Sequence, residues 1–374
     1  MQDNDKPKFA FLDLKATYDE CSKEIKIAVE NFFKSGNYIL GAEVQSFENE
    51  FAQYCNAQNC IGVANGLDAL VILLRALGVS ENDNVIVPSN TYIATALAVS
   101  AVGAKPIFCE PDEDTYNLCP KNLKLILKTS KVKAVIAVHL YGQMANITKI
   151  KQVTDEEGIL LIEDAAQAHG STHMGKKAGS ESDGAAYSFY PSKNLGAFGD
   201  AGAIVCNSDI TSNKCKIIRN YGSEKKYYNS VKGLNSRLDE FHAAILRIKL
   251  RYLDLWNERR NDIAKFYLSQ IEALGSPIKL PQVDSDNNHV WHQFIVRTNI
   301  RDNFIEHLNN KGIPTSIHYP VPPFSQECYK HEYINDFPLA TKISNEIISL
   351  PIGPHLKLEQ AQIVVEAISQ CKFV

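Results

Sequence analysis

Short, almost continuously apolar runs alternate with segments of helical periodicity along most of the chain. Such runs are typical of strands buried on both faces, and the helices between them imply a mainly parallel sheet. The predicted strands are residues 60–63, 84–87, 106–109, 134–140, 159–163, 185–189 and 203–206. Helices are predicted at 25–33, 44–54, 66–77 and 92–102. The pattern therefore indicates an α/β fold with helices covering both faces of the sheet.

The pattern changes in the last third of the chain. Apolar residues at three- and four-residue steps predict one long helix from Arg237 to Leu274. A strand and two further helices follow, at 290–296, 302–311 and 360–369. The length of 374 residues suggests about two domains. We therefore expect a large domain of residues 1–250 and a smaller C-terminal α+β domain of residues 251–374.

Composition narrows the class of protein. Hydrophobic residues make up 45%, charged residues 22%, and the formal net charge is -4 without a long basic block. This balance argues against nucleic acid or an anionic membrane as the main partner. We find no stretch of 18 apolar residues and no secretory signal, and we expect a cytoplasmic protein. The nine cysteines, without Cys-x-x-Cys spacing, predict reduced thiols that fill the core, and no metal site.

Candidate chemistry follows the predicted strands, because ligands of open α/β sheets bind beyond the carboxyl ends of the strands. After the first strand, Asn65-Gly66 opens a helix whose N-terminus suits a phosphate, although Asn-Gly is also ordinary turn chemistry. Tyr92 follows the second strand and suits either a flat ligand or the core. Asp164 ends a strongly apolar strand. A buried carboxylate without a cationic partner is costly, so Asp164 forms a structural ion pair or serves function.

Lys193 stands between the apolar run 185–190 and three glycines at 196, 199 and 202. A lone lysine in a loop is most often simply solvated. One sheet edge, however, combines a phosphate-binding helix N-terminus, an aromatic ring, a buried carboxylate and a lysine. This combination matches a pyridine ring that bears a phosphate and an aldehyde. The lysine would form an imine with the aldehyde, and the carboxylate would keep the ring nitrogen protonated.

Six motifs in order along nearly the whole chain resemble the fold-type I, pyridoxal-phosphate-dependent sugar aminotransferases of the DegT/DnrJ/EryC family. The motifs are Ala64-Asn65-Gly66-Leu67-Asp68-Ala69-Leu70, Pro88-Ser89-Asn90-Thr91-Tyr92-Ile93-Ala94-Thr95, His139-Leu140-Tyr141-Gly142-Gln143, Glu163-Asp164-Ala165-Ala166-Gln167, Ser188-Phe189-Tyr190-Pro191-Ser192-Lys193 and Asn235-Ser236-Arg237-Leu238-Asp239. One departure is Phe241-His242, where the family usually has leucine and glutamine; we expect it to affect interface packing alone.

The resemblance implies a role for each cofactor-binding residue. Lys193 is the Schiff-base lysine, and Asp164 pairs with the pyridinium nitrogen. Gln167 contacts the phenolic oxygen of the cofactor, and Tyr92 stacks on its ring. The cofactor is pyridoxal 5′-phosphate, with pyridoxamine 5′-phosphate as its intermediate form. Its phosphate is held in a site shared by the two subunits of a homodimer, through Gly66, Leu67 and Ser188, with Asn235 from the partner.

The resemblance also implies a reaction. Relatives that are dehydratases carry histidine in place of Lys193, so the lysine favours transamination. Tyr141-Gly142-Gln143 and the segment 317–323 resemble enzymes that act on 3-keto sugars, whereas C-4 enzymes more often carry histidine at Gln143. We expect transfer of the amino group of L-glutamate to a thymidine-diphosphate-linked 3-keto-6-deoxyhexose. The product would supply a surface polysaccharide, such as a lipopolysaccharide O-antigen, or another glycan.

The implied sugar contacts are Tyr190, His318, Tyr319 and a lysine on a loop of the partner subunit. Lys226 is the candidate for that lysine, and Lys225 fits equally well; Arg219 and Lys226 are candidates for the diphosphate. His318 between prolines also suits a purely structural role. The alternatives are a C-4 sugar or cyclitol aminotransferase of the same family, and a non-catalytic binding or regulatory protein on this fold, which the intact site residues disfavour.

Overall fold

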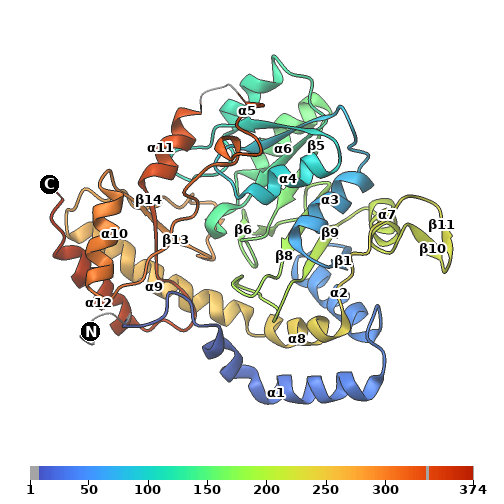
Figure 1. Ribbon diagram of the computed structural model, residues 1–374, viewed down its shortest axis with the longest axis horizontal. Coiled ribbons are helices and arrows are strands. Elements are labelled where there is room, and N and C mark those ends of the chain that lie inside the picture. Colours follow the sequence, from blue (N-terminus) through green and yellow to red (C-terminus); the bar gives the residue numbers. More distant parts are fainter. Residues whose placement is uncertain (1–7, 334–336, 374) are drawn as a thin grey trace.

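The computed structural model describes residues 8–333 and 337–373. Its centre is a seven-stranded sheet in the order β1-β9-β8-β5-β4-β2-β3 (Figure 1). The pairs that join β8, β5, β4, β2 and β3 are parallel, and β9 runs antiparallel to β1 and β8. Each predicted apolar run overlaps one of these strands: β1 (Asn59–Val63), β2 (Asn84–Pro88), β3 (Lys105–Cys109), β4 (Ala134–Val138), β5 (Leu160–Asp164), β8 (Gly184–Ser188) and β9 (Gly202–Cys206).

Helices cover both faces of the sheet, as the pattern predicted. Successive residues of a strand point to opposite faces, so Val85 and Val87 of β2 pack in one core and Ile86 packs in another. The first face is covered by α3 (Gly66–Ala76), α4 (Ile93–Ala101) and α7 (Asp209–Arg219). The second face is covered by α2 (Ala42–Tyr54), α5 (Pro120–Leu127), α6 (Ile147–Glu157) and α8 (Glu240–Leu250).

The predicted helix over 237–274 is wrong in one respect, because the structure has two helices there. α8 ends at Leu250, and α9 (Leu253–Ala273) begins after Tyr252. The two helices serve different cores: Leu246 packs with α2 and β8, whereas Ile263 packs in the C-terminal core. Apolar periodicity continues across the junction, so the change of direction leaves no trace in the pattern.

Two predicted strands also have different limits. The run 134–140 is a strand only to Val138, and the chain then turns through η2 (Leu140–Gly142), where Tyr141 has a φ of 62°. The segment 290–296 becomes β13 (Phe294–Arg297), because Trp291 has a φ of 48° and interrupts extended structure. Both irregular segments lie at the functional site described below.

The C-terminal part contains helices around a small antiparallel sheet of β13 and β14 (Ile347–Leu350). Its core is formed with α9, α10 (Arg301–Asn310) and α12 (Leu358–Ser369), and Phe9 from the beginning of the chain packs there. In the opposite direction, Phe324 and Phe337 reach back to pack on the core of the large sheet near Phe108. The division at residue 250 remains a prediction.

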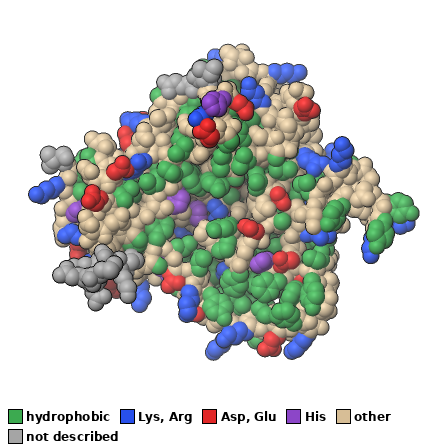
Figure 2. Space-filling model, in the orientation of Figure 1, with side chains coloured by type: hydrophobic (Ala, Val, Ile, Leu, Met, Phe, Trp, Pro, Cys, Tyr) green, Lys and Arg blue, Asp and Glu red, His purple; other side chains and the backbone are tan. Residues whose placement is uncertain are grey.

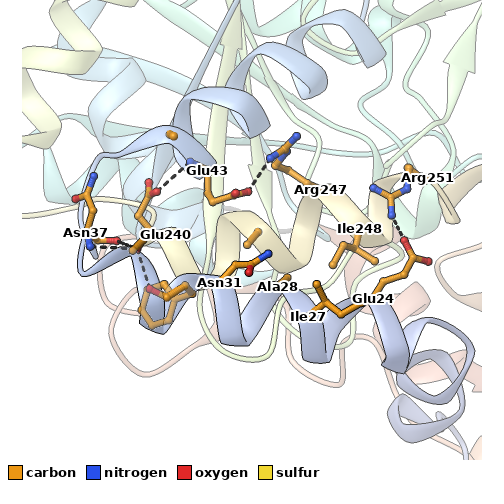
Figure 3. A pocket seen from close by; sticks show the side chains of 14 residues that line it. Glu24, Ile27, Ala28, Asn31, Asn37, Glu43, Glu240, Arg247, Ile248 and Arg251 are labelled. Carbon is orange, nitrogen blue, oxygen red and sulfur yellow. Dashed lines mark hydrogen bonds and ion pairs between the residues drawn. The ribbon is translucent and has the colours of Figure 1, made fainter.

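Glu240 joins α8 to the beginning of α2, in a groove that α1 (Leu14–Ser35) closes (Figure 3). Its carboxylate accepts hydrogen bonds from the backbone N–H groups of Gly41 (2.7 Å), Glu43 (2.9 Å) and Val44 (3.0 Å). These N–H groups have no acceptor within the first turn of α2. Arg247, two turns farther along α8, forms an ion pair with Glu43 at 2.7 Å. The two helices are therefore held together by charge as well as by packing.

All nine cysteines are free, and six are buried, in agreement with their expected role as core residues. Among residues 8–333 and 337–373, no group of three or more His, Cys, Asp and Glu side chains is arranged to hold a metal ion. No helix in the described part of the chain is long and apolar enough to cross a membrane.

Candidate active site

A cavity of about 530 Å³ lies at the carboxyl ends of β4, β5 and β8, beside the first residues of α3 and α4. Segments of the C-terminal part close its other wall. Ten of the predicted site residues line this cavity: Gly66, Leu67, Tyr92, Asp164, Gln167, Ser188, Tyr190, Lys193, His318 and Tyr319. The sheet and the C-terminal part together therefore bring into one cavity residues that are more than 250 positions apart.

The phosphate cradle predicted at the start of α3 is a tight junction of strand and helix. Asn65 caps α3, and its Oδ1 accepts a hydrogen bond from the N–H of Asp68 at 2.8 Å. The other free N–H groups of the first turn carry the positive end of the helix dipole. A Cβ on Gly66 would lie 2.6 Å from Cβ of Ser188, and one on Gly202 would lie 2.4 Å from the carbonyl carbon of Asn65. Glycine is required at both positions for this close approach.

Asp164 is 7% exposed, which confirms that the end of this strand is largely desolvated. Its Oδ2 accepts a hydrogen bond from the hydroxyl of Thr95 at 2.8 Å, and its Oδ1 accepts one from the N–H of Ala166 at 3.2 Å. None of the ion pairs among the described residues includes Asp164. Both hydrogen bonds to the carboxylate thus come from neutral donors, and the carboxylate suits a cationic ligand group.

Lys193 is held by a tight turn that leaves β8. Its N–H donates to the carbonyl of Tyr190 at 2.8 Å, and the N–H of Ala197 donates to the carbonyl of Phe189 at 2.7 Å. A Cβ on Gly196 would lie 2.4 Å from the carbonyl oxygen of Pro191, so glycine is required for the turn to close. The turn fixes the Lys193 backbone while the side chain lines the cavity.

The surroundings of Lys193 favour an uncharged amine. Burial lowers the pKa of Lys193 to about 8, although the carboxylate of Asp164 raises it in part. Burial, followed by the charge of Lys193, lowers the pKa of His169 to about 3 and that of His318 to about 4. Both histidines are therefore neutral near Lys193. A lysine that is partly neutral near physiological pH is a far better nucleophile than an ordinary one.

This titration leads to a prediction for the cofactor-free protein. Only the neutral amine reacts with trace acetic anhydride, so labelling of Lys193 should reach half its maximum near pH 8, well below the value of about 10.4 for ordinary lysines. Peptide mass spectrometry at successive pH values measures it. In Asp164→Asn the midpoint should move to lower pH, because the charge that raises the pKa is lost. A midpoint near that of ordinary lysines would contradict the assignment.

A hydrogen-bonded group of aromatic and amide side chains faces the sheet edge. Gln167 accepts from the N–H of Tyr141 at 2.7 Å and donates through Nε2 to the hydroxyl of Tyr319 at 2.9 Å. The Tyr319 ring lies 5.0 Å from that of Tyr92, which is 53% exposed and is therefore not a core residue. His318 contacts the Ser349 hydroxyl at 2.6 Å. One Nε2 hydrogen of Gln167 and one face of Tyr92 thus remain for a ligand.

The predicted contact of Arg219 with a diphosphate is wrong. Arg219 is buried, forms an ion pair with Glu48 and donates to the carbonyl of Gly62 at 2.7 Å, away from the cavity. Gln143, which carried part of the substrate prediction, is also buried outside the cavity. Its side chain donates to the carbonyl of Gln282 at 3.0 Å and accepts from the N–H of Asp284 at 2.8 Å.

Asn235 and Lys226 do not line the cavity of their own chain. Lys226 lies between β10 (Ser223–Lys225) and β11 (Tyr228–Asn229), in a hairpin that projects from the body of the molecule (Figure 1). Lys225, Lys226 and Asn235 are all exposed. A role for them at a site requires that site to belong to another chain.

Several further residues of the site escaped the prediction. Asp200, His292 and Gln293 line the cavity, and Thr95 also binds Asp164. Thr95 lies one helical turn beyond Tyr92, and Asp200 lies in the glycine-rich turn, so both had a weak signal in the motifs. His292 and Gln293 had none, because they approach the cavity from a segment about 100 residues after Lys193.

The chain matches known proteins over almost its entire length. Residues 19–369 match the model of the DegT/DnrJ/EryC1/StrS aminotransferase family. The dTDP-3-amino-3,6-dideoxy-alpha-D-galactopyranose transaminase of Aneurinibacillus thermoaerophilus is 49% identical over 361 residues, 96% of this chain and 98% of the relative. The dTDP-3-amino-3,4,6-trideoxy-alpha-D-glucose transaminase of Streptomyces venezuelae is 45% identical over 366 residues, covering 97% and 96%.

A solved structure agrees with these sequences. The crystal structure of S. venezuelae DesV in complex with a ketimine intermediate superposes with a TM-score of 0.95 at 45% identity, covering 98% of each chain. The fold and the residues around the cavity had indicated the same kind of protein. The chain belongs to the DegT/DnrJ/EryC1/StrS aminotransferase family.

Proposed function

We propose that the protein is a pyridoxal-phosphate-dependent aminotransferase that converts a thymidine-diphosphate-linked 3-keto-6-deoxyhexose and L-glutamate into the 3-amino-3,6-dideoxyhexose. The observation that carries this proposal is the identity of 49% and 45%, along nearly the whole chain, to two transaminases whose names specify 3-amino sugars linked to dTDP. The reaction takes place in the cytoplasm and supplies a surface polysaccharide such as an O-antigen, or another glycan.

The residues of the cavity fit the cofactor. The N-terminus of α3 with Ser188 suits its phosphate, Asp164 suits the protonated ring nitrogen, and Tyr92 has a free face for the ring. Lys193 has a lowered pKa and suits the aldehyde. When bound, the cofactor withdraws electrons from the substrate carbon that loses its proton. This chain supplies the groups that hold it.

Lys193 and Asp164 have separate tasks in this proposal. Once released, the amine of Lys193 removes a proton from the α-carbon of glutamate and returns one to C-3 of the sugar. A pKa of about 8 suits both directions of transfer near neutral pH. Asp164 keeps the proton on the ring nitrogen. Because the amino donor and the sugar use the same cavity in turn, we expect ping-pong kinetics.

The sugar would lie against the wall formed by Tyr190, His318 and Tyr319, which all line the cavity. Gln143 would influence indirectly which carbon of the sugar receives the amino group. It ties the segment at 282–284 to the turn that contains Tyr141, whose hydroxyl donates to the carbonyl of His318 at 2.6 Å. A change at Gln143 would therefore move the sugar-binding wall without a direct contact.

A homodimer with shared sites is part of the proposal. Lys193 is the one lysine or arginine lining the cavity in the described chain, yet both substrates are anionic. Lys225 or Lys226, with Asn235, would supply the missing donors from a partner subunit. Hydrophobic side chains gather on α8 and α1 (Figure 2), where Ile27 and Phe33 are 61% and 64% exposed. An apolar surface of this kind favours association with another chain.

The test supplies paired 3-keto and 4-keto nucleotide sugars with glutamate and follows amino-sugar formation by mass spectrometry and NMR. We expect amination of the 3-keto sugar at C-3. Amination of the 4-keto compound alone would contradict the regiochemistry and favour a C-4 enzyme. A cofactor absorbance that does not change with glutamate, together with no amination, would favour a non-catalytic protein.

A further inference from the structure

A chain of side-chain amides beneath the cavity determines the orientation of Asn194, the neighbour of Lys193. Its Nδ2 donates to the carbonyl of Val290 at 2.9 Å and to Oδ1 of Asn257 at 2.8 Å. Asn257 in turn donates through Nδ2 to the carbonyl of His169 at 2.8 Å. Backbone carbonyls only accept hydrogen bonds, so both amides have a single satisfactory orientation. The Oδ1 of Asn194 is therefore the atom that faces His292.

This orientation fixes the tautomer of His292. Nδ1 of His292 lies 3.1 Å from Oδ1 of Asn194, and an amide oxygen only accepts, so Nδ1 carries the hydrogen. Burial, followed by the charge of Lys193, holds the pKa of His292 well below its ordinary value, and the ring is neutral. A neutral ring has one N–H. Nε2 is therefore an acceptor, and it is the ring nitrogen left for the cavity that His292 lines.

The backbone around His292 is held in an unusual conformation. Trp291 has a φ of 48°, a region that bulky side chains rarely adopt. The N–H groups on either side donate to η2: Val290 to the carbonyl of Gly142 at 2.9 Å, and Gln293 to that of Tyr141 at 3.2 Å. A Cβ on Gly142 would lie 2.8 Å from the backbone nitrogen of His292. Such strain persists where the surrounding contacts determine it, often at functional sites.

We propose that His292 is a specificity-determining residue for the sugar, and that its Nε2 accepts a hydrogen bond from a hydroxyl group of the hexose. This inference rests on the proposed function. The carboxylates of glutamate and the phosphates of the nucleotide only accept hydrogen bonds, so Nε2 of His292, which is itself an acceptor, cannot bind them. The amino group of glutamate is engaged at the reacting centre. The donors that remain near Lys193 are the hydroxyls at C-2 and C-4 of the product sugar.

The experiment measures binding of the product, dTDP-3-amino-3,6-dideoxyhexose, and of its 2-deoxy and 4-deoxy analogues to the cofactor-loaded enzyme by calorimetry. In the wild type, loss of one hydroxyl should weaken binding roughly tenfold. The amide of His292→Asn still donates to Asn194 but has no atom at the place of Nε2. In this variant, the parent sugar should bind no more tightly than the analogue whose missing hydroxyl weakened binding to the wild type. His289→Asn is the matched control, because His289 is equally buried in the same segment outside the cavity. The amide oxygen can still accept the hydrogen bond that Nδ1 of His289 accepts from the N–H of Trp291 at 2.9 Å.

The comparison separates a direct contact from a structural role. His292→Phe provides a second variant, and melting temperatures identify any that fails to fold. The proposal would be overturned if each deoxy analogue lost the same binding affinity, relative to the parent sugar, in the wild type and in both His292 variants. The proposal would also be overturned if His292→Asn reduced the absorbance change driven by glutamate as strongly as it reduced the binding of the sugar. If the wild type responds to glutamate but does not bind the parent sugar, the proposed sugar substrate is wrong, and the role of His292 is contradicted as well.

Discussion

Replacing Lys193 with alanine is expected to reduce turnover by about 10³-fold or more, because one side chain supplies both the nucleophile and the proton carrier. No other lysine lines the cavity in the described chain, so no lysine of the same chain can take over either task. The fold should survive. The pKa of Lys193 is lowered in the folded state, so protonation of this amine opposes folding as pH falls below the ordinary lysine value of about 10.4, and the full effect is present below about 8. The variant should therefore melt at the same or a higher temperature.

The measurement combines steady-state transamination with borohydride reduction and intact mass spectrometry. The wild type should gain the mass of one cofactor per chain, and Lys193→Ala should gain none. Lys193→Arg is the matched control, because it keeps a cation near Asp164 but cannot form the covalent link. Near-wild-type turnover in either variant would show that Lys193 is not the reactive residue.

Replacing Asp164 with asparagine is expected to slow both half-reactions by about 10²–10³-fold, the range found when one preorganised electrostatic group is removed. The change keeps the shape and the acceptor for Thr95 while it removes the negative charge. Without that charge the ring nitrogen loses its proton and the cofactor withdraws electrons poorly. Stopped-flow absorbance with glutamate, and separately with the keto sugar, measures the two rates.

Thr95→Val is the matched control for Asp164. It removes the 2.8 Å hydrogen bond to Oδ2 with little change in volume, and it leaves the charge in place. Loss of a single neutral donor should cost about tenfold or less. An Asp164→Asn variant with altered cofactor affinity but unchanged rates would contradict the role, as would a Thr95→Val variant that is equally slow.

The strands of the sheet were predictable because parallel strands buried on both faces require uninterrupted apolar residues. The same logic located Asp164 and Ser188, since polar residues that directly follow such strands meet at one edge. The order of the strands was not predictable from the runs. β1 pairs with β9, more than 130 residues away, and only packing selects that partner.

Arg219 and His292 illustrate what local patterns miss. Arg219 is the last residue of α7, near an exposed hairpin, and only its contact with Glu48, 171 residues away, removes it from the site. His292 lies 98 residues from Asn194, whose amide determines its tautomer. In both cases the chemistry of the side chain depends on a distant partner.

The sequence by itself determined the alternation of strands and helices, the residues at the strand ends and the family to which they belong. These features arise from neighbouring residues, whose periodicity and chemistry can be read along the chain. The tertiary structure alone decided the lowered pKa of Lys193, the unpaired charge of Asp164 and the acceptor that His292 presents. Burial and hydrogen bonding set these properties, and both depend on segments that only folding brings together.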